Sequence, residues 1–508
     1  MSEEKDTRYQ LLENNAQAIR ALMQAVESTI GPKGMDTMLL DPFGSVTITN
    51  DGMTILEMME VNHPVAKMLI NAVRSQQEAT GDGTTTATLL AGEMILMGIE
   101  QINKGVPAAQ IIKGINQAVL MAEEEWQKEK ILWDFHDKQT RQKIALIAAR
   151  EYADIANLIS QAAENVGEEK LREENFALAS CIKGVQGAQG EVFNGVILSK
   201  NRHDKQMPEH LEGEIKVLVI DDALDSEEID DKALSTESGF REYMNLKKEF
   251  RSNLQKIIAS GAKLVLVDRG INNEAAEILS EAGIMAISRI PHQELEQAAE
   301  HCGAYMLRRT GLKKDLDEIK KYLGTLSEVI DDEKLSFCKL IGGGGEQRAT
   351  VIITAATAEV VGERERIAKD AAAALQAAVK HGLVAGGGAG ELAVAHSLQN
   401  RRDELTGMSG YGLDCVVAAL KKPFMQIVKN AGFNPLEKIG DVAQAQEQRG
   451  NHYLAVECEN GQIADMQALG VLDPYDVKLH ALKTAAEAAS AILRINIIIK
   501  KKEYQNKE

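Results

Sequence analysis

Apolar residues recur every three or four positions in both end regions of the chain, a spacing that is typical of amphipathic helices. Helices are predicted at residues 15–27, 54–60, 65–79, 87–102 and 364–380. Between the first two of these segments, alternating apolar positions on either side of Pro42 and Gly44 predict a β-hairpin with strands over 38–40 and 46–48. Both ends of the chain are therefore expected to be mainly helical.

The middle of the chain follows another pattern. Short apolar runs predict strands at residues 215–220, 263–268, 284–288 and 304–307. Helical stretches over 272–281 and 293–302 separate them, which predicts a βαβ sheet with helices packed on it. The expected fold class is multidomain, mainly α at the ends and α/β in the middle. The order suggests one domain assembled from both chain ends, with the middle inserted into it.

Two segments fit neither pattern. Residues 221–235, DDALDSEEIDDKALS, are strongly acidic and precede a helix predicted over 237–259. This arm is either a solvated surface segment or one that folds only against a neighbouring copy of the chain. The apolar segment ILRINIII, residues 492–499, alternates and predicts a strand, with a solvated tail after it.

Composition limits the class of protein. The 508 residues exceed the size of one core, so two or three domains are expected. With 44% hydrophobic and 26% charged residues, the chain is expected to be soluble and globular. It has no uncharged apolar run of the roughly 20 residues that span a bilayer, so a membrane is not an expected partner. The polar first residues have no signal-peptide pattern behind them, and a cytoplasmic location is expected.

Charge and cysteine content argue against further classes of partner and of structural site. The 57 Lys and Arg against 76 Asp and Glu give a net charge of −19 without a long basic stripe, so nucleic acid is not an expected partner. The five cysteines lie far apart and form no CxxC pair, which predicts ordinary buried thiols. Aromatic residues are only 4%, so cores of aliphatic side chains between closely approaching helices are expected.

The stretch GDGTTTAT, residues 81–88, carries specific chemistry. Its glycines allow close backbone approach, and a helix beginning near Thr85 directs free N–H groups at an anion, with threonine hydroxyls as added donors. Asp82 among these donors fits a phosphate only if Mg²⁺ lies between them. The stretch therefore indicates a metal-nucleotide site, and the alternative is a capped helix after a glycine turn.

Other turns have a similar composition. They are STIGPKG (28–34), TNDG (49–52), AGGGAGE (385–391) and LDP (472–474). In the last of these, Asp473 is a candidate N-cap of the helix that follows. The sequence has no G-x-x-x-x-G-K-[ST] motif, and no G-x-G-x-x-G follows a strand, so a P-loop or Rossmann nucleotide site is not expected.

Several long motifs, in order, resemble those of the chaperonins, the ring-forming ATP-driven folding machines. They include STIGPKGMDTMLLDPFG, ATGDGTTTATLLAGE, LVAGGGAGELAVA, NAGFNPLEKI and GVLDPYDVKLHALKTAAEAASAILRI. The resemblance is dense over about the first 130 and last 125 residues and looser between them. It implies a chaperonin fold with a helical equatorial ATPase domain, a small intermediate domain in two pieces, and a βαβ apical domain with a helical protrusion.

The resemblance also implies boundaries. The equatorial domain would comprise 1–132 and 384–508, the intermediate domain 133–190 and 347–383, and the apical domain 191–346, with its lid protrusion at about 221–258.

Site residues and cofactors follow from the same motifs. ATP and Mg²⁺ are the implied cofactors, with Asp82 as the metal ligand. The implied nucleotide-binding residues are Thr29, Ile30, Gly31, Pro32, Asn50, Gly52, Gly83, Thr84, Thr85, Thr86, Gly387 and Asp473. Hydrolysis needs a water aligned with the γ-phosphate, and Asp51 and Asp370 are the residues expected to orient or deprotonate it. Asp370 would belong to the intermediate domain and reach the site when that domain closes.

The subtype resembled is group II, with a built-in lid, so a separate co-chaperonin is not expected. Two departures stand out. The lysine that senses the γ-phosphate in group II has no clear counterpart, although Arg150 is nearby, and Asp473 stands where group II members usually have Glu. These mixed features resemble the bacterial members called group III.

The function implied is an ATP-dependent chaperone that encloses non-native proteins in a chamber of stacked rings. Exposed strand edges would then pair within or between subunits. Two alternatives stay open at this point. One is a Mg-ATP-dependent phosphotransferase, which would be a monomer or dimer that requires an acceptor. The other is a ring-forming holdase without turnover, in which Asp370→Ala would change nothing.

Overall fold

The computed structural model describes residues 2–42, 44, 46–227 and 237–499. The chain forms two compact units. The terminal unit is built from residues 1–160, 168–180 and 366–508, and the middle unit from 161–167 and 181–365. The two chain ends thus share one unit. The three-domain boundaries given above stay a prediction.

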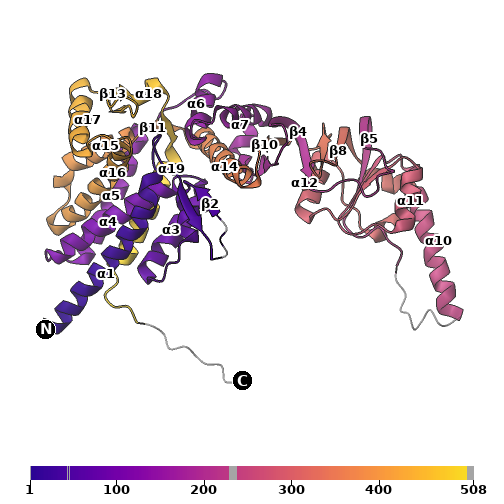
Figure 1. Ribbon diagram of the computed structural model, residues 1–508, viewed down its shortest axis with the longest axis horizontal. Helices are drawn as coiled ribbons and strands as arrows, with labels where there is room; N and C mark the ends of the chain where they lie inside the picture. Colours follow the sequence, from indigo (N-terminus) through magenta and orange to yellow (C-terminus); the bar gives the residue numbers. More distant parts are fainter. Residues whose placement is uncertain (1, 43, 45, 228–236, 500–508) are drawn as a thin grey trace. The chain divides into compact units, whose positions relative to one another are not determined.

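The terminal unit is mainly helical (Figure 1). Its longer helices are α1 (Ser2–Val26), α3 (Pro64–Thr80), α4 (Thr84–Asn103), α5 (Ala108–Lys128), α15 (Ala389–Asn400), α16 (Gly410–Asn430), α17 (Pro435–Arg449) and α19 (Tyr475–Leu493). Shorter or bridging helices are α2 (Gly52–Met58), α6 (Lys138–Ala148), α7 (Ala153–Val166), α8 (Glu168–Arg172), α14 (Ala358–His381) and α18 (Met466–Leu469). Helix α4 is the centre of the packing, because α1, α16 and α19 all contact it.

The helices of this unit approach one another closely, as the low aromatic content predicts. Its largest core cluster is dominated by aliphatic side chains, with Trp126 as a large exception. Helices α5 and α16 meet through glycines. A Cβ added at Gly412 would lie 2.1 Å from the Ile111 carbonyl oxygen, and one added at Gly114 would lie 1.9 Å from the Ser409 carbonyl oxygen. Only residues without side chains allow this contact.

Three small two-stranded sheets complete the terminal unit. They pair β1 (Thr37–Leu40) with β2 (Val46–Thr49), β11 (Leu383–Ala385) with β14 (Leu472–Pro474), and β12 (Leu454–Val456) with β13 (Ile463–Asp465). All three pairs are antiparallel. The first is the predicted hairpin. The second joins the segment after α14 to the segment before α19, and so brings two predicted site turns together.

The middle unit is built on an eight-stranded sheet in the order β3-β10-β4-β9-β8-β5-β6-β7. The strands are β3 (Ile182–Gly184), β4 (Glu191–Leu198), β5 (His210–Ile220), β6 (Leu264–Val267), β7 (Met285–Ile287), β8 (Gly324–Asp332), β9 (Phe337–Ile341) and β10 (Ala349–Ile353). Strands β5, β6 and β7 are parallel neighbours, which confirms the predicted βαβ alternation.

Helices cover both faces of that parallel part. They are α10 (Glu237–Ala259), α11 (Asn273–Glu281) and α12 (His292–Cys302), and the short α13 (Leu316–Ile319) follows them. Leu218 and Val265 face a core shared with α10 and α11, whereas Val217 and Leu264 face a core shared with α12. Successive residues of a strand point to opposite faces, so these strands are apolar throughout.

Two predicted strands are wrong. Residues 304–307 contribute only a single bridge, between Leu307 and Ile220. Of residues 492–499, Ile492 and Leu493 end helix α19 with buried side chains, and 495–499 have no regular structure. Ile492 and Leu493 continue the helical spacing of α19 and so belong to that helix. Residues 495–499 have no neighbouring strand within the described residues with which to form backbone hydrogen bonds.

Some expectations fall partly outside the described residues. Residues 228–235 of the acidic arm and the tail over 500–508 lie there. The helix predicted over 237–259 is α10. Within the described residues, no helix is both long and apolar enough to cross a bilayer. None of the five cysteines, all of which lie within the described residues, forms a disulfide, and burial raises the pKa of Cys302 and of Cys415 to about 12, which suits inert thiols.

Candidate active site

The glycine loop joins α3 to α4. Gly81 ends α3 with φ 71°, and Gly83 precedes α4 with φ 81°, both in the left-handed region that glycine enters without strain. Asp82 lies between them, and its Oδ1 accepts a 2.6 Å hydrogen bond from the Gly83 N–H. Helix α4 begins at Thr84 with no side-chain cap, so the N–H groups of its first turn are available to an anion.

Three segments that are distant in sequence meet at Thr85. The Thr29 and Thr85 hydroxyl oxygens are 3.4 Å apart. A Cβ added at Gly52 would lie 2.6 Å from Thr85 Oγ1 and 3.1 Å from Thr85 N. Thr84 and Thr86 are buried beside it. The structure therefore brings the predicted threonine run next to the 29–32 and 50–52 segments.

The 29–32 segment is held from the other side by α16. Asn430 Nδ2 donates to the carbonyl oxygens of Glu27 and Ile30, each at 2.9 Å. Gly31 has φ 88°, and a Cβ there would lie 3.1 Å from Ile427. Pro32 follows on the exposed side. The turn is thus fixed by hydrogen bonds to its backbone, and the Thr29 hydroxyl donates to the Val26 carbonyl oxygen at 2.8 Å.

Asp51 caps helix α2. Its Oδ2 accepts hydrogen bonds from Thr54 N (2.8 Å) and Thr54 Oγ1 (2.7 Å). Its Oδ1 lies 3.6 Å from Arg366 Nη1, and that nitrogen donates to Asp370 Oδ2 at 2.7 Å. Arg366 Nη2 also donates to Asn50 Oδ1 at 3.4 Å. One guanidinium therefore links Asp51 and Asp370, and both carboxylates are mostly buried.

The three-glycine turn faces Asp473. Gly387 and Gly388 have φ 63° and 82°, and Gly388 is the N-cap of α15. A Cβ added at Gly386 would lie 3.1 Å from Asp473 Cγ. Asp473 is not the N-cap of α19, contrary to the prediction. It pairs with Val384 inside β14, and Pro474 occupies the cap position.

Asp473 has a buried partner that the sequence prediction missed. Lys478 Nζ lies 2.8 Å from Asp473 Oδ2 and 2.7 Å from Glu391 Oε1. Burial acts to lower the pKa of Lys478, but the two carboxylates outweigh it and the pKa is raised. Lys478 therefore stays charged and fixes the position of Asp473.

The carboxylates of the site disfavour one another's ionisation. Burial raises the pKa of Asp82, and Asp473 raises it further. Burial raises the pKa of Asp370 to about 8, with Asp82 and Asp51 adding to the effect and Arg366 opposing it. A pocket of crowded carboxylates beside free helix N–H groups fits a divalent cation with an anionic ligand, because the cation would neutralise the carboxylates. The residues present thus fit Mg²⁺.

Arg150 belongs to the same electrostatic environment. Its charge acts to lower the pKa of both Asp82 and Asp370. Arg150 and Glu151 follow α6 with φ 52° and 66°, a left-handed pair that costs non-glycine residues about 1–2 kcal/mol each. Strain of this kind gathers at functional sites.

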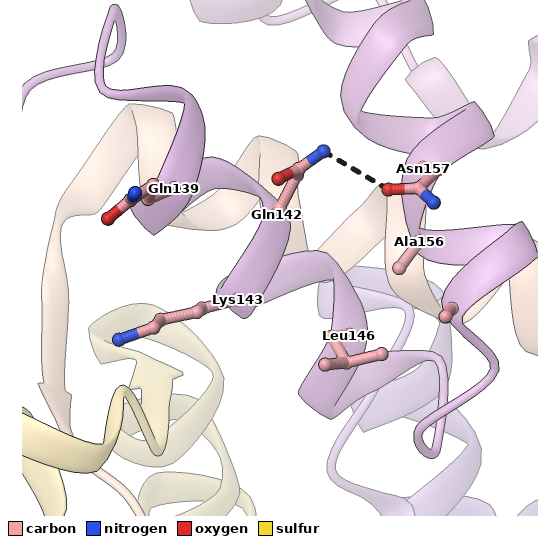
Figure 2. Close-up of a pocket in the computed structure, with 7 residues that line it drawn as sticks. Gln139, Gln142, Lys143, Leu146, Ala156 and Asn157 are labelled. Carbon is pink, nitrogen blue, oxygen red and sulfur yellow. Dashed lines mark hydrogen bonds between the residues drawn. The ribbon is translucent and has the colours of Figure 1, made fainter.

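A separate hollow of about 260 Å³ lies between α6 and α7 (Figure 2). It is lined by Gln139, Gln142, Lys143, Leu146, Ala153, Ala156 and Asn157. Gln142 Nε2 donates to Asn157 Oδ1 at 3.1 Å across its rim. None of the predicted site residues lines it.

All the predicted site residues lie in the terminal unit. Comparison with known proteins assigns this unit and the rest of the chain to one family. Residues 22–503 match the model of the TCP-1/cpn60 chaperonin family. The chain belongs to this family.

The relatives of this chaperonin agree with that assignment. It is 31% identical to thermosome subunit alpha of Archaeoglobus fulgidus, over 97% of this chain and 92% of the relative. It is 32% identical to thermosome subunit beta of Thermococcus kodakarensis, over 96% and 91%. A crystal structure of a group III chaperonin in the open state has a TM-score of 0.89 and 41% identity, and the match covers 97% of this chain and 99% of that one.

The predicted resemblance to the chaperonins is thereby confirmed, and so is the chaperonin fold. This chaperonin is an ATP-dependent chaperone and an ATPase whose hydrolysis is coupled to protein folding. The phosphotransferase and the holdase without turnover are not supported. Identity is higher to the group III chaperonin than to the two thermosome subunits, which agrees with the mixed features of the sequence.

Proposed function

We propose that the chaperonin binds Mg-ATP in the pocket built around Thr85. Asp82 would hold Mg²⁺, and the glycines and threonines of the loop and the 29–32 turn would contact the phosphates. Gly387 would contact ribose or phosphate, and Asp473 the nucleoside end. The observation that carries the proposal is that a single guanidinium, that of Arg366, joins Asp51 to Asp370 beside this pocket.

Hydrolysis would use this pair of carboxylates. Asp51 is fixed by Thr54, and Asp370 is fixed by Arg366, so both can hold a water in line with the γ-phosphate. The raised pKa of Asp370 makes it a stronger base once it is ionised, which suits a group that takes a proton from that water. Mg²⁺, when bound, would neutralise the charge that develops on the phosphate oxygens.

We further propose that subunits assemble into a double ring that encloses non-native protein. Two exposed apolar surfaces support this. The hairpin β1–β2 is a two-stranded sheet that exposes Met38 (61%) and Leu40 (69%), which suits pairing with a neighbouring subunit. Helix α10 exposes Phe240 and Met244, which suits contact with unfolded chains or with a neighbour.

The domain roles form part of the same proposal. Residues 1–132 and 384–508 would be the equatorial domain, 133–190 and 347–383 the intermediate domain, and 191–346 the apical domain with a lid protrusion over 221–258. The lid would close the chamber without a separate co-chaperonin. Cytoplasmic location stays a prediction.

Electron microscopy of the purified protein tests the assembly. We expect stacked rings that are open without nucleotide and closed with ATP plus a fluoride mimic of the γ-phosphate. Absence of rings, or rings that close only after a partner protein is added, would contradict the proposal.

Steady-state ATP hydrolysis tests the residue roles. Asp82→Asn should raise the Mg²⁺ concentration needed for half-maximal rate, and Asp370→Asn should lower kcat by about 10²–10⁴ while ATP still binds. Asp414→Asn, on α16 and in a partly exposed pair with Arg402, is the matched control and should change neither. Wild-type turnover in Asp370→Asn would remove it from the mechanism.

A further inference from the structure

Gln76, on α3, is a fully buried polar side chain (0% exposed) that the mechanism above does not use. Its Nε2 lies 2.9 Å from Thr80 Oγ1, 2.9 Å from the Asp82 carbonyl oxygen and 3.3 Å from the Val477 carbonyl oxygen. Because the two carbonyl oxygens can only accept, the amide nitrogen is the end that faces them. The amide nitrogen thus contacts the glycine loop at Asp82 and helix α19 at Val477.

The other end of the amide is also held by α19. Gln76 Oε1 lies 2.6 Å from His480 Nδ1, and the Thr484 hydroxyl lies 3.2 Å from the same nitrogen. The side chain therefore has partners for both its donor and its acceptor groups. A buried amide with all its partners in place is fixed in one orientation.

The backbone of Asp82 depends on this amide. Its flanking residues, Gly81 and Gly83, are glycines, so the local chain has little stiffness of its own. The Asp82 carbonyl oxygen accepts from Gln76 Nε2 and lies 2.9 Å from Thr80 Oγ1. A Cβ added at Gly83 would lie 2.8 Å from Val477 Cγ1 and 3.1 Å from Gln76 Nε2, so the loop lies directly against this amide.

We infer that Gln76 is a positioning residue for Asp82, which fixes the peptide of the metal ligand to helix α19 and so directs its carboxylate at the cation. The inference rests on the proposed role of Asp82. Thr80 assists through the same carbonyl oxygen. Outer partners that orient a metal ligand are worth about 10–100-fold in metal affinity when they are removed.

Measuring metal affinity in the presence of ADP distinguishes a positioning role of Gln76 from a general effect on folding. Mn²⁺ serves as the probe, and electron paramagnetic resonance counts free Mn²⁺ during a titration of the whole assembled protein with ADP. For Gln76→Met we expect the Mn²⁺ dissociation constant to rise about tenfold. ADP affinity without metal should stay within about twofold of the wild type, because the hydrogen bond from Gln76 to the loop is made to the Asp82 carbonyl oxygen, on the residue proposed to hold the metal.

Gln446→Met is the matched control. Gln446 is a buried glutamine on α17 whose Nε2 donates to the His452 and Leu454 carbonyl oxygens, so its loss removes the same kind of bond elsewhere. Its Mn²⁺ affinity should equal that of the wild type. If Gln76→Met does not fold, Thr80→Val decides the question, since it keeps the shape of the side chain and removes the hydroxyl that contacts both Gln76 Nε2 and the Asp82 carbonyl oxygen. We expect a rise of about threefold or more in that variant.

The outcomes are distinct. Unchanged Mn²⁺ affinity in Gln76→Met, or in Thr80→Val where the first variant does not fold, overturns the inference. An equal loss of ADP affinity with and without metal also overturns it, because the effect would then not pass through the cation. Asp82→Asn is measured beside them. Wild-type Mn²⁺ affinity in Asp82→Asn would instead overturn the proposed metal role of Asp82.

Discussion

Arg366 donates to Asp370 across one turn of α14, at 2.7 Å, with both side chains mostly shielded from solvent. The same nitrogen lies 3.6 Å from Asp51. Arg366 is thus the element that keeps two like-charged carboxylates of the terminal unit together, since their mutual effect is to raise the pKa of Asp370 and the arginine opposes it. Bringing Asp370 next to Asp51 therefore has an electrostatic cost that the arginine offsets.

Removing this arginine should affect turnover more than binding. In Arg366→Gln the carboxylates lose the charge between them, so the pKa of Asp370 would rise further or its side chain would turn away, and we expect kcat to fall by at least about tenfold. The KM for ATP should change by less than about threefold. Steady-state ATP hydrolysis at saturating Mg²⁺ measures both. Arg402→Gln, which breaks a partly exposed pair with Asp414, is the control. A KM effect larger than the kcat effect would place Arg366 in nucleotide binding instead.

Lys478 should be important for stability. Glu391 is 1% exposed, and its Oε1 is paired with Lys478. Lys478→Met would leave that carboxylate buried without its cation, a change that costs about 3–5 kcal/mol. Chemical denaturation of the variant measures the loss.

The control for that variant lies on the same helix. Lys483→Met breaks a more exposed pair with Glu123, for which a loss below about 1 kcal/mol is expected. Adding Glu391→Gln to Lys478→Met should recover part of the loss, because one of the two carboxylates left without the lysine is then neutral. Equal losses from the two lysine substitutions would contradict the prediction.

Two glycine substitutions should change the free energy of unfolding in opposite directions, one at the contact between α5 and α16 and the other on α17. Gly412→Ala places a methyl group 2.1 Å from the Ile111 carbonyl oxygen, so the helices must separate and we expect a loss of about 2 kcal/mol or more in the free energy of unfolding. Gly440→Ala, on α17, meets nothing within 4 Å and should stabilise by about 0.5–1 kcal/mol through helix propensity. Thermal unfolding of both variants checks the signs. A stabilising Gly412→Ala would refute the close contact.

His301 should make the middle unit sensitive to acid. It is fully buried on α12, where its Nε2 accepts from the Gly343 N–H at 3.0 Å and its Nδ1 faces the Glu346 carbonyl oxygen at 3.1 Å. Burial lowers the pKa of this imidazole. The unfolded chain therefore binds a proton below about pH 6.5 that the folded chain does not, and stability falls as the pH drops through that value, by up to about 1.4 kcal/mol per pH unit.

Comparison with a variant isolates this histidine. Denaturant midpoints at pH 5.5 and 7.5 should differ more in the wild type than in His301→Gln, which cannot take up the proton. The same pH dependence in both proteins would assign the effect to other groups.

Much of the architecture follows from local sequence. Helical spacing predicts α3, α4 and α14, and apolar runs predict β5 and β6, because each of these elements buries a regular face. The segment 492–499 shows the limit. Its β-branched residues favour a strand locally, but packing of α19 takes Ile492 and Leu493 into the helix, and no strand of the described chain pairs with the remainder.

The site was only partly predictable. The loop around Asp82 carries its own chemistry, since a carboxylate between glycines and threonines indicates a metal and a phosphate. Asp370 has no such signal and comes only from family resemblance. Gln76 and Lys478 were missed because some of their partners lie far away in sequence, 401 residues for the contact of Gln76 with Val477 and 87 for that of Lys478 with Glu391. An isolated Gln or Lys on a helix is ordinarily a surface residue, and only the fold shows it buried.

The 401 residues between Gln76 and Val477 impose an order of folding events while the chain is being synthesised. Helix α19 packs against α3, α4 and α5, and it supplies the partners of Gln76. The ribosome must therefore translate the whole middle unit before the pocket around Asp82 can close. A nascent chain whose first helices have emerged would hold an unfinished α3–α4 core, exposed until α19 arrives, and could not yet respond to ATP. Nucleotide binding would thus report that the two end regions of a newly made chain have packed together.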